Sequence, residues 1–232
     1  MAGATIWKGN LHFGDTDVPV KRRAAVREER LQFHLLHRRD GARLRQQMIC
    51  AYEKKPVPGE EHAKGFEVEE GKYLLVEPAE LEQAAPESSR TIEVHEFVKT
   101  KEIDPLFFDR LYYLEPDLAD IKGKDFVALA KALKELDVAG ICTWAMRKRS
   151  YFGALQAHGK ALRLHTLRYA DEVIAADSLG LQEAPFSEKE LKIGIELIEK
   201  LTAPFEPGKF QNEHQEKLKE MIAKKARGEK IS

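Results

Sequence analysis

The sequence has few cysteines and lacks long apolar runs. Cys50 and Cys142 are its only two cysteines in 232 residues, which excludes a framework of disulfides. We expect both to be reduced, buried thiols of a cytosolic protein, with a bridge between them as the alternative. No stretch of about 18 apolar residues occurs, so no membrane-spanning helix is expected. The first ten residues include Lys8 and no apolar signal core, so no export is expected either.

The usual signatures of catalysis and of nucleotide binding are also absent. There is no Gly-rich phosphate loop with Gly-Lys-Ser/Thr, no Rossmann glycine pattern, no His-Glu-x-x-His and no Gly-x-Ser-x-Gly. The eight histidines are scattered, and the closest pair, His34 and His37, would point to opposite faces of a strand. Asp117 and Asp120 lie in a segment so acidic that a solvated face is the better interpretation. We therefore expect no enzymatic activity, no metal and no cofactor.

Charge is nearly balanced overall, at −1, but is sorted along the chain. Residues 1–55 carry +6 and residues 121–170 carry +7, whereas residues 56–120 carry −11 and residues 171–232 carry −3. The balanced total hides two basic segments that can form one positive surface for a polyanion. We expect these two segments to line that surface together, with the acidic segment lying outside it.

Most of residues 5–170 shows the pattern of short strands separated by turn signals. Strands are predicted at residues 4–13, 18–26, 31–35, 43–51, 71–76, 91–99, 138–147, 150–156 and 161–167. In the strand over 91–99 we expect Ile92, Val94 and Phe97 to face inward. Helical spacing predicts helices at residues 78–81, 126–136 and 212–227, and another that starts at a capping box of Ser187 and Glu190 and ends before Pro204. The predicted fold class is mainly β with additional α-helices.

Several basic residues stand two apart on predicted strands, so that their side chains share one face. These pairs are Arg43 with Arg45, Arg147 with Arg149, and Lys21 with Arg23. Leu44, between the first two, is expected to face a core. Paired arginines present rigid donor forks to phosphate oxygens. Few aromatic residues interleave with them, which argues against stacking on single strands, and no helix-turn-helix pattern is evident. Together these features favour contacts to the backbone of a duplex. The same spacing also fits ordinary solvated edge residues, so both interpretations stay open.

A series of short motifs occurs in order along almost the whole chain. The motifs are IWKGNLHFG at residues 6–14, VPVK at 18–21, FHLLH at 33–37, KGFE at 64–67, GKY at 71–73, EIDP at 102–105, YYL at 112–114, LRYADE at 167–172 and PFEP at 204–207. Each motif alone is weak, whereas their combination in this order is specific. By this combination the chain resembles the prokaryotic Ku family, the DNA-end-binding proteins of non-homologous end joining.

The resemblance implies a Ku-type β-barrel with a ring-forming arm and short C-terminal helices. Residues 1–180 would form the barrel core and the bridging arm, which bind DNA and dimerise, and residues 181–232 would form the C-terminal helical segment. The implied function is sequence-independent binding of double-stranded DNA ends by a homodimeric ring in double-strand break repair. The ring would protect the ends and recruit a multifunctional ATP-dependent DNA ligase. Such a protein would be cytoplasmic and nucleoid-associated, with no membrane partner.

The resemblance also implies which residues meet DNA. Lys21, Arg147 and Arg149 match basic positions of the family's DNA-facing surface, Arg43 and Arg45 lie in its basic strand, and Arg22 is added to this set. Many bacterial relatives carry Cys-x-x-Cys where this chain reads Cys50-Ala51-Tyr52-Glu53, so no metal or redox role is transferred to Cys50. The alternative function is a β-barrel scaffold for protein partners without direct DNA-end binding. A DNA-processing nuclease is a third candidate, for which the sequence offers no cluster of metal ligands.

Overall fold

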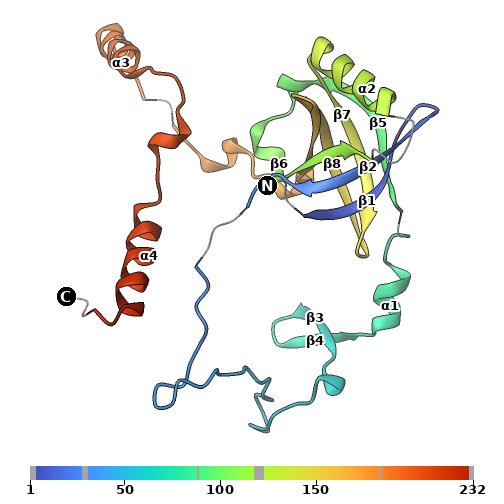
Figure 1. The fold of residues 1–232 in the computed structure, drawn as a ribbon, viewed down its shortest axis with the longest axis vertical. Helices are drawn as coiled ribbons and strands as arrows, with labels where there is room; N and C mark the ends of the chain where they lie inside the picture. The colour runs from blue at the N-terminus through green and yellow to red at the C-terminus, as the bar shows by residue number, and fades with distance from the viewer. Residues whose placement is uncertain (1–3, 28–30, 88, 118–122, 183, 230–232) are drawn as a thin grey trace. The chain divides into compact units, whose positions relative to one another are not determined.

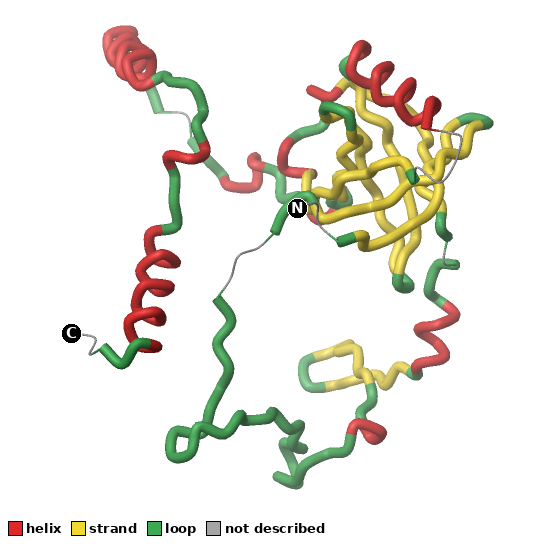
Figure 2. The backbone as a smooth tube through the Cα atoms, in the orientation of Figure 1, coloured by secondary structure: helices red, strands yellow, loops and turns green. Residues whose placement is uncertain are grey.

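The computed structural model describes residues 4–27, 31–87, 89–117, 123–182 and 184–229. Asp120, one of the acidic residues considered above, lies outside these ranges. The chain divides into two compact units, one with residues up to 28 and His34–Ile174, the other with residues 29–33 and Ala175–Ser232. In the first unit strands predominate, and in the second the regular structure is helical (Figure 2).

Strands of the first unit close into a barrel (Figure 1). In spatial order they are β1 (Thr5–Phe13), β2 (Thr16–Ala24), β6 (Phe108–Pro116), β9 (Ala161–Leu167), β8 (Arg149–His158), β7 (Val138–Met146) and β5 (Thr91–Lys99). Neighbouring strands are antiparallel except β1 and β5, whose parallel pairing from Asn10 opposite Thr91 closes the barrel. The predicted strands at 4–13, 18–26, 91–99, 138–147, 150–156 and 161–167 are thereby confirmed, and so is the mainly β fold with helices.

Apolar side chains fill the inside of the barrel. The fully buried ones include Leu11, Val18, Val20, Ile92, Leu114, Leu155, Leu162 and Leu164. Helix α2 (Gly123–Leu136) packs against β7 and β8, and its residues Phe126, Leu129 and Leu133 join the same apolar cluster. Each large apolar side chain that leaves water in this way contributes ~1.5–3 kcal/mol. The helical spacing predicted for 126–136 is confirmed, although Leu136 at its end is exposed.

Two details of the barrel differ from the sequence pattern. Phe97 does not face inward but is half exposed, because the pairing of β5 with β7 shifts register between Val94 and Glu96 and the alternation changes there. The sequence pattern also does not predict β6, whose residues do not alternate cleanly between apolar and polar. Short 3₁₀ helices complete the connections: η2 (Thr100–Glu102), η3 (Pro105–Phe107), η4 (Ala170–Glu172) and, in the second unit, η5 (Ala176–Leu179) and η6 (Pro207–Lys209).

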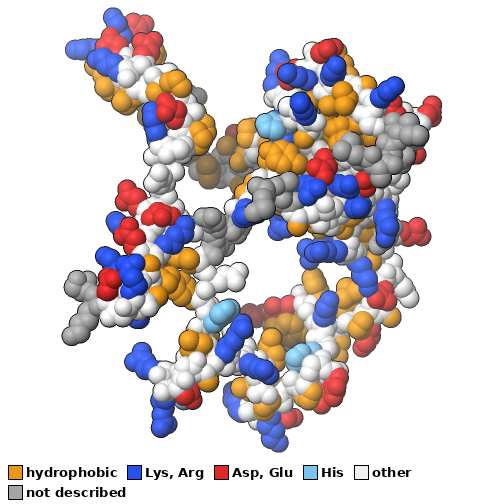
Figure 3. Space-filling model, in the orientation of Figure 1, with side chains coloured by type: hydrophobic (Ala, Val, Ile, Leu, Met, Phe, Trp, Pro, Cys, Tyr) orange, Lys and Arg blue, Asp and Glu red, His pale blue; other side chains and the backbone are white. Residues whose placement is uncertain are grey.

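Between β2 and β5 the chain forms an arm. Its regular elements are η1 (Gly59–Glu61), the hairpin of β3 (Lys64–Glu69) with β4 (Lys72–Val76), and α1 (Pro78–Gln83), of which β4 and α1 are as predicted. The predicted strands at 31–35 and 43–51 are wrong, since only the isolated bridges Leu36–Arg43 and Ile49–Pro56 form there. Alternating residues make a stable strand only where a sheet extends the hydrogen bonds and covers one face, and the few backbone hydrogen bonds at these two bridges do not extend into a sheet. Apolar side chains of the arm are accordingly exposed (Figure 3).

The second unit contains α3 (Glu188–Leu201) and α4 (Glu213–Ala226), which confirms both predicted helices. The capping box is present: the Ser187 hydroxyl accepts from the Glu190 amide at 3.3 Å, and the Glu190 carboxylate accepts from the Ser187 amide at 2.8 Å. Ile195 and Ile198 of the predicted apolar stripe are exposed on α3. In the described part of the chain, no helix has the length and apolar character needed to cross a membrane.

Candidate nucleic-acid interface

The tight turn between β7 and β8 carries Arg147 and Lys148. Met146 pairs with Arg149 across it, and the two central residues have φ of 52° and 62°, the arrangement of a type I′ hairpin turn. The expectation that Arg147 and Arg149 share one face of a strand is therefore wrong, because Arg147 belongs to the turn. Lys148 forms an ion pair of 2.5 Å with Glu82 of α1. The turn lies at the end of a hairpin that projects from one end of the barrel (Figure 1).

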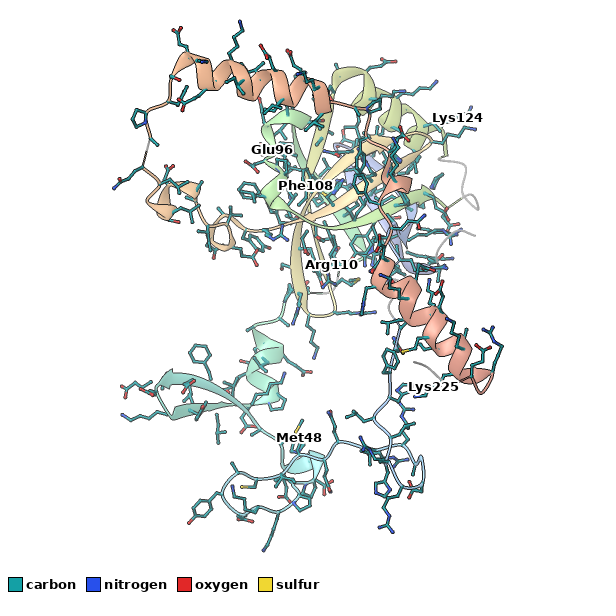
Figure 4. The ribbon with its side chains drawn as sticks, turned by 90° about the vertical axis from the view of Figure 1, so that its left-hand side faces the viewer. Met48, Glu96, Phe108, Arg110, Lys124 and Lys225 are labelled. Carbon is teal, nitrogen blue, oxygen red and sulfur yellow. The ribbon has the colours of Figure 1, made fainter. Side chains whose placement is uncertain are left out.

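Arg147 and Arg149 nevertheless meet at one pocket of about 470 Å³. Its other basic lining residues are Arg22, Arg110 of β6 and Arg168 just after β9, and its carboxylates are Asp109 and Glu172. Figure 4 places Arg110 near the end of the barrel from which the hairpin projects. Arginines from four separate parts of the barrel thus surround one concave surface.

The carboxylates of this pocket already have partners. Asp109 lies 3.7 Å from both Arg110 and Arg168, and Arg168 also donates to the backbone carbonyls of Leu106, at 2.8 Å, and Phe108. The Glu172 carboxylate accepts from the Tyr169 amide at 2.7 Å. No acidic side chain in the described ranges forms an ion pair with Arg147 or Arg149. These two exposed guanidinium groups therefore keep donors for an external anion.

Lys21 is placed differently, because acidic residues at the end of β6 and just after it form ion pairs on the outward face of β2. The Lys21 ammonium lies 2.7 Å from Asp117, and Arg23 lies 2.6 Å from Glu115. Lys8 on β1 also approaches Asp117, at 3.7 Å. Lys21 and Arg23 share a face as predicted, but their charges are compensated inside the protein. We expect Lys21 to attract phosphate less than Arg147 or Arg149 does.

Arg22 points inward and is only 2% exposed. Its guanidinium carbon lies 4.5 Å from the ring centre of Tyr112 and 5.9 Å from that of Trp7, and Nη2 donates to the Met146 sulfur at 2.9 Å. Nε has no hydrogen-bond partner among the described residues. Burial lowers the pKa of Arg22, and the nearby charge of Arg147 lowers it further. In this position Arg22 cannot meet a duplex on the outer surface, and it reaches an anion only through the pocket.

Arg43 and Arg45 lie on the arm and not on the barrel. Both are exposed, and Arg43 forms a hydrogen bond of 3.3 Å with the His34 ring. They follow a turn at Asp40–Gly41, where Gly41 has a φ of 71° and its amide donates to the His37 carbonyl at 2.8 Å. Leu44 is exposed rather than turned to a core, since no strand forms there. The six predicted residues thus divide into four on the barrel and two on the arm.

Arg110 and Arg168 line the pocket, but spacing does not predict them. Arg168 lies within the LRYADE motif, which is a usable signal, whereas Arg110 lies on β6, the strand that the pattern does not predict. Burial also shifts the pKa values of Cys142 on β7 and His165 on β9. Burial raises the pKa of the Cys142 thiol to about 12 and lowers that of His165 to about 4, so both are neutral near pH 7. Within the described part of the chain, no three His, Cys, Asp or Glu side chains gather as a metal site would need.

Comparison with known proteins matches this barrel to one family. The family model described as the Ku70/Ku80 beta-barrel domain matches residues 12–193. The protein named Non-homologous end joining protein Ku 2 from Geotalea uraniireducens is 68% identical over 232 residues, which cover 100% of this chain and 90% of that protein. Proteins named Non-homologous end joining protein Ku from Heliobacterium modesticaldum and from an Anaeromyxobacter species are 39% and 40% identical, over 84% and 76% of their own lengths and 100% and 97% of this chain. The Ku-type barrel implied by the motif order is thereby confirmed, and the chain belongs to the Ku family.

Proposed function

We propose that this protein binds the ends of double-stranded DNA, without sequence preference, in the repair of double-strand breaks by non-homologous end joining. The observation that carries the proposal is the match to Ku over residues 12–193, together with 68% identity to a relative that bears the name of this process. The protein would hold the end as a homodimeric ring, protect it, and recruit a multifunctional ATP-dependent DNA ligase.

The arginines of the β7–β8 turn support binding to the DNA backbone. Arg147 and Arg149 have exposed guanidinium groups that no described carboxylate pairs with, and two such forks suit phosphate oxygens. Contacts to phosphates position a protein on DNA but carry no sequence information. Selectivity for ends then comes from topology, because a closed ring can only be threaded at an end.

The arm and the filled barrel support the homodimer. The inside of the barrel is packed with its own side chains, so one copy cannot enclose a duplex within it. The exposed large apolar side chains of the arm need cover that a second copy can provide. They include Leu35, Leu36, Leu44, Met48, Ile49, Tyr52, Phe66, Val68, Tyr73, Leu74 and Leu75. We propose that two arms meet and complete the ring.

A comparison of linear and circular DNA tests the proposal. A short linear duplex and a covalently closed circle of the same sequence are titrated with the protein at equal salt. We expect the linear duplex to bind far more tightly, and cutting the circle once should restore binding. Equal affinity for the two would contradict threading. No measurable affinity at about 50 mM salt, where phosphate contacts are strongest, would favour the protein-interaction scaffold.

The mass of the free protein and its effect on ligation test the remaining parts. Light scattering should give the mass of a dimer, and a stable monomer that still binds ends would reject the ring. Addition of the protein to an ATP-dependent DNA ligase and linear duplex should raise the rate of end joining. The same rate with and without the protein would argue against ligase recruitment.

A further inference from the structure

Arg22 is a buried charge for which the described residues provide no counter-charge. Its side chain is 2% exposed, its Nε lacks a hydrogen-bond partner, and the groups around the guanidinium are two aromatic rings and a thioether sulfur. Contact with the Tyr112 ring offsets part of the loss of hydration through cation–π attraction. A buried charge without a carboxylate partner is nevertheless costly, and proteins retain few of them. An anion would supply the counter-charge that Arg22 lacks among the described residues.

Two more unpaired arginines stand beside it. Arg147 and Arg149 line the same pocket as Arg22, and Arg147 is close enough for its charge to disfavour the charged form of Arg22. The two carboxylates of the pocket, Asp109 and Glu172, do not balance the positive charge, because five arginines line it and Asp109 already lies near Arg110 and Arg168. Three positive charges therefore converge on one cavity from β2, from the β7–β8 turn and from the start of β8.

We propose that this pocket binds the phosphate at a strand terminus of the DNA, with Arg22 as its floor and Arg147 and Arg149 as its rim. The inference rests on the proposed DNA-end binding. Guanidinium forks match the oxygens of a tetrahedral phosphate, and a terminal phosphate carries more negative charge than an internal one. An internal phosphate is flanked by sugars on both sides, whereas a terminal one can project into a cavity of about 470 Å³. The floor of the pocket thus contacts the end itself, while Arg147 and Arg149 on its rim keep further N–H donors for neighbouring phosphates of the backbone.

Thermal unfolding with inorganic phosphate as the probe tests whether the pocket holds phosphate. The variant Arg22→Met keeps length and apolar contacts but removes the charge, and Arg23→Met makes the same change one residue away on the outward face of β2. Phosphate also stabilises proteins non-specifically, so each variant is compared with chloride at equal ionic strength. We expect phosphate to raise the melting temperature of the wild type and of Arg23→Met by the same amount. The increment for Arg22→Met should be clearly smaller, and an equal increment in all three would overturn the proposal.

Duplexes with and without terminal phosphates test whether the source is a DNA end. Linear duplexes of one sequence with 5′-phosphate, 3′-phosphate or only hydroxyl termini are titrated with the wild type. We expect one phosphorylated form to bind about tenfold more tightly than the hydroxyl form, the effect of one charge-assisted hydrogen bond. Equal affinity for all three, with ends still preferred over circles, would overturn this inference and leave the proposed function standing. If inorganic phosphate raises the melting temperature but none of the phosphorylated duplexes binds more tightly, the pocket holds a free ion and the assignment to a DNA end is overturned.

A rim variant keeps the test valid if Arg22→Met folds poorly. Arg147→Asn suits the positive φ of the turn, and Lys148→Asn is its matched control in the same turn but outside the pocket. We expect Arg147→Asn to reduce the preference for the phosphorylated duplex severalfold. Lys148→Asn should preserve the wild-type ratio, and a loss of preference in both variants would contradict the assignment to the pocket.

Discussion

Removal of the charges of Arg147 and Arg149 together should weaken DNA binding in a salt-dependent way. The double variant Arg147→Asn, Arg149→Gln keeps a residue that tolerates positive φ in the turn, so the hairpin is preserved. Both side chains are exposed, and no carboxylate among the described residues pairs with them, so their full charge is available to phosphate. Lys21→Gln is the matched control, because Asp117 at 2.7 Å already neutralises Lys21.

The structure sets the size of the expected change. Each phosphate contact contributes about 0.9 to the slope of the logarithm of affinity against the logarithm of salt concentration. With one phosphate contacted by each of the two guanidinium groups, the slope should become shallower by roughly 1.8 for one copy and by roughly 3.6 for a homodimer. Lys21→Gln should change the slope by well under one unit.

Fluorescence anisotropy of a labelled linear duplex, titrated at several salt concentrations, measures these slopes. Equal melting temperatures of the free proteins would show that the variants remain folded. An unchanged slope in the double variant would place the DNA surface elsewhere on the molecule. A change in Lys21→Gln as large as that in the double variant would refute the argument from charge compensation.

Two further predictions concern the barrel itself. A Cβ at Gly153 would lie 2.4 Å from the His165 carbonyl oxygen and 2.7 Å from the Trp144 ring, so Gly153→Ala should destabilise the barrel by about 1–3 kcal/mol in urea unfolding. Gly194→Ala, which meets no atom within 4 Å, is the control, and equal stability of the two variants would contradict the crowding. His165 has a folded-state pKa of about 4 against an ordinary 6.5, so the unfolded chain takes up its proton first as the pH falls. Stability should therefore decrease as the pH falls from about 7 to about 4. Midpoints of urea unfolding measured across this range should decrease less in His165→Gln than in the wild type. An identical pH dependence in the variant would exclude His165 as the source of the decrease.

The barrel could be predicted from sequence because its strands bury one face in a regular pattern. In β1, β2 and β9 one face is buried, so alternation, turn signals and β-prone residues agree with one another. Helix α2 likewise has one apolar face, and the capping box at Ser187 is a local interaction that three residues suffice to encode. Where local pattern and tertiary packing favour the same structure, a pattern in the sequence is enough.

The arm and the site depend on information that local pattern does not carry. Leu35 alternates with its neighbours as a strand residue would, but the described residues form only an isolated bridge beside it, at Leu36–Arg43, and leave its side chain exposed. Arg147 follows a strand pattern, yet β7 and β8 turn back at that residue. Arg22 lies between two outward basic residues, and only the closure of the barrel shows that its side chain is buried. Each of these outcomes is decided by which segments pair across the sheet.

Ion pairs within the protein reduce the positive charge that the two basic segments, residues 1–55 and 121–170, can offer to a polyanion. The expectation that the acidic segment 56–120 lies apart from the basic strands is wrong for Asp117, Glu115 and Glu82, which pair with Lys21, Arg23 and Lys148 respectively. On the barrel surface, the positive charge of the first basic segment, residues 1–55, is therefore largely compensated. Among the arginines that line the pocket, Arg110 and Arg168 lie near Asp109, whereas Arg22, Arg147 and Arg149 have no carboxylate partner among the described residues. Three such arginines around one cavity favour a single projecting phosphate, and the end of a DNA strand is the place where a phosphate projects.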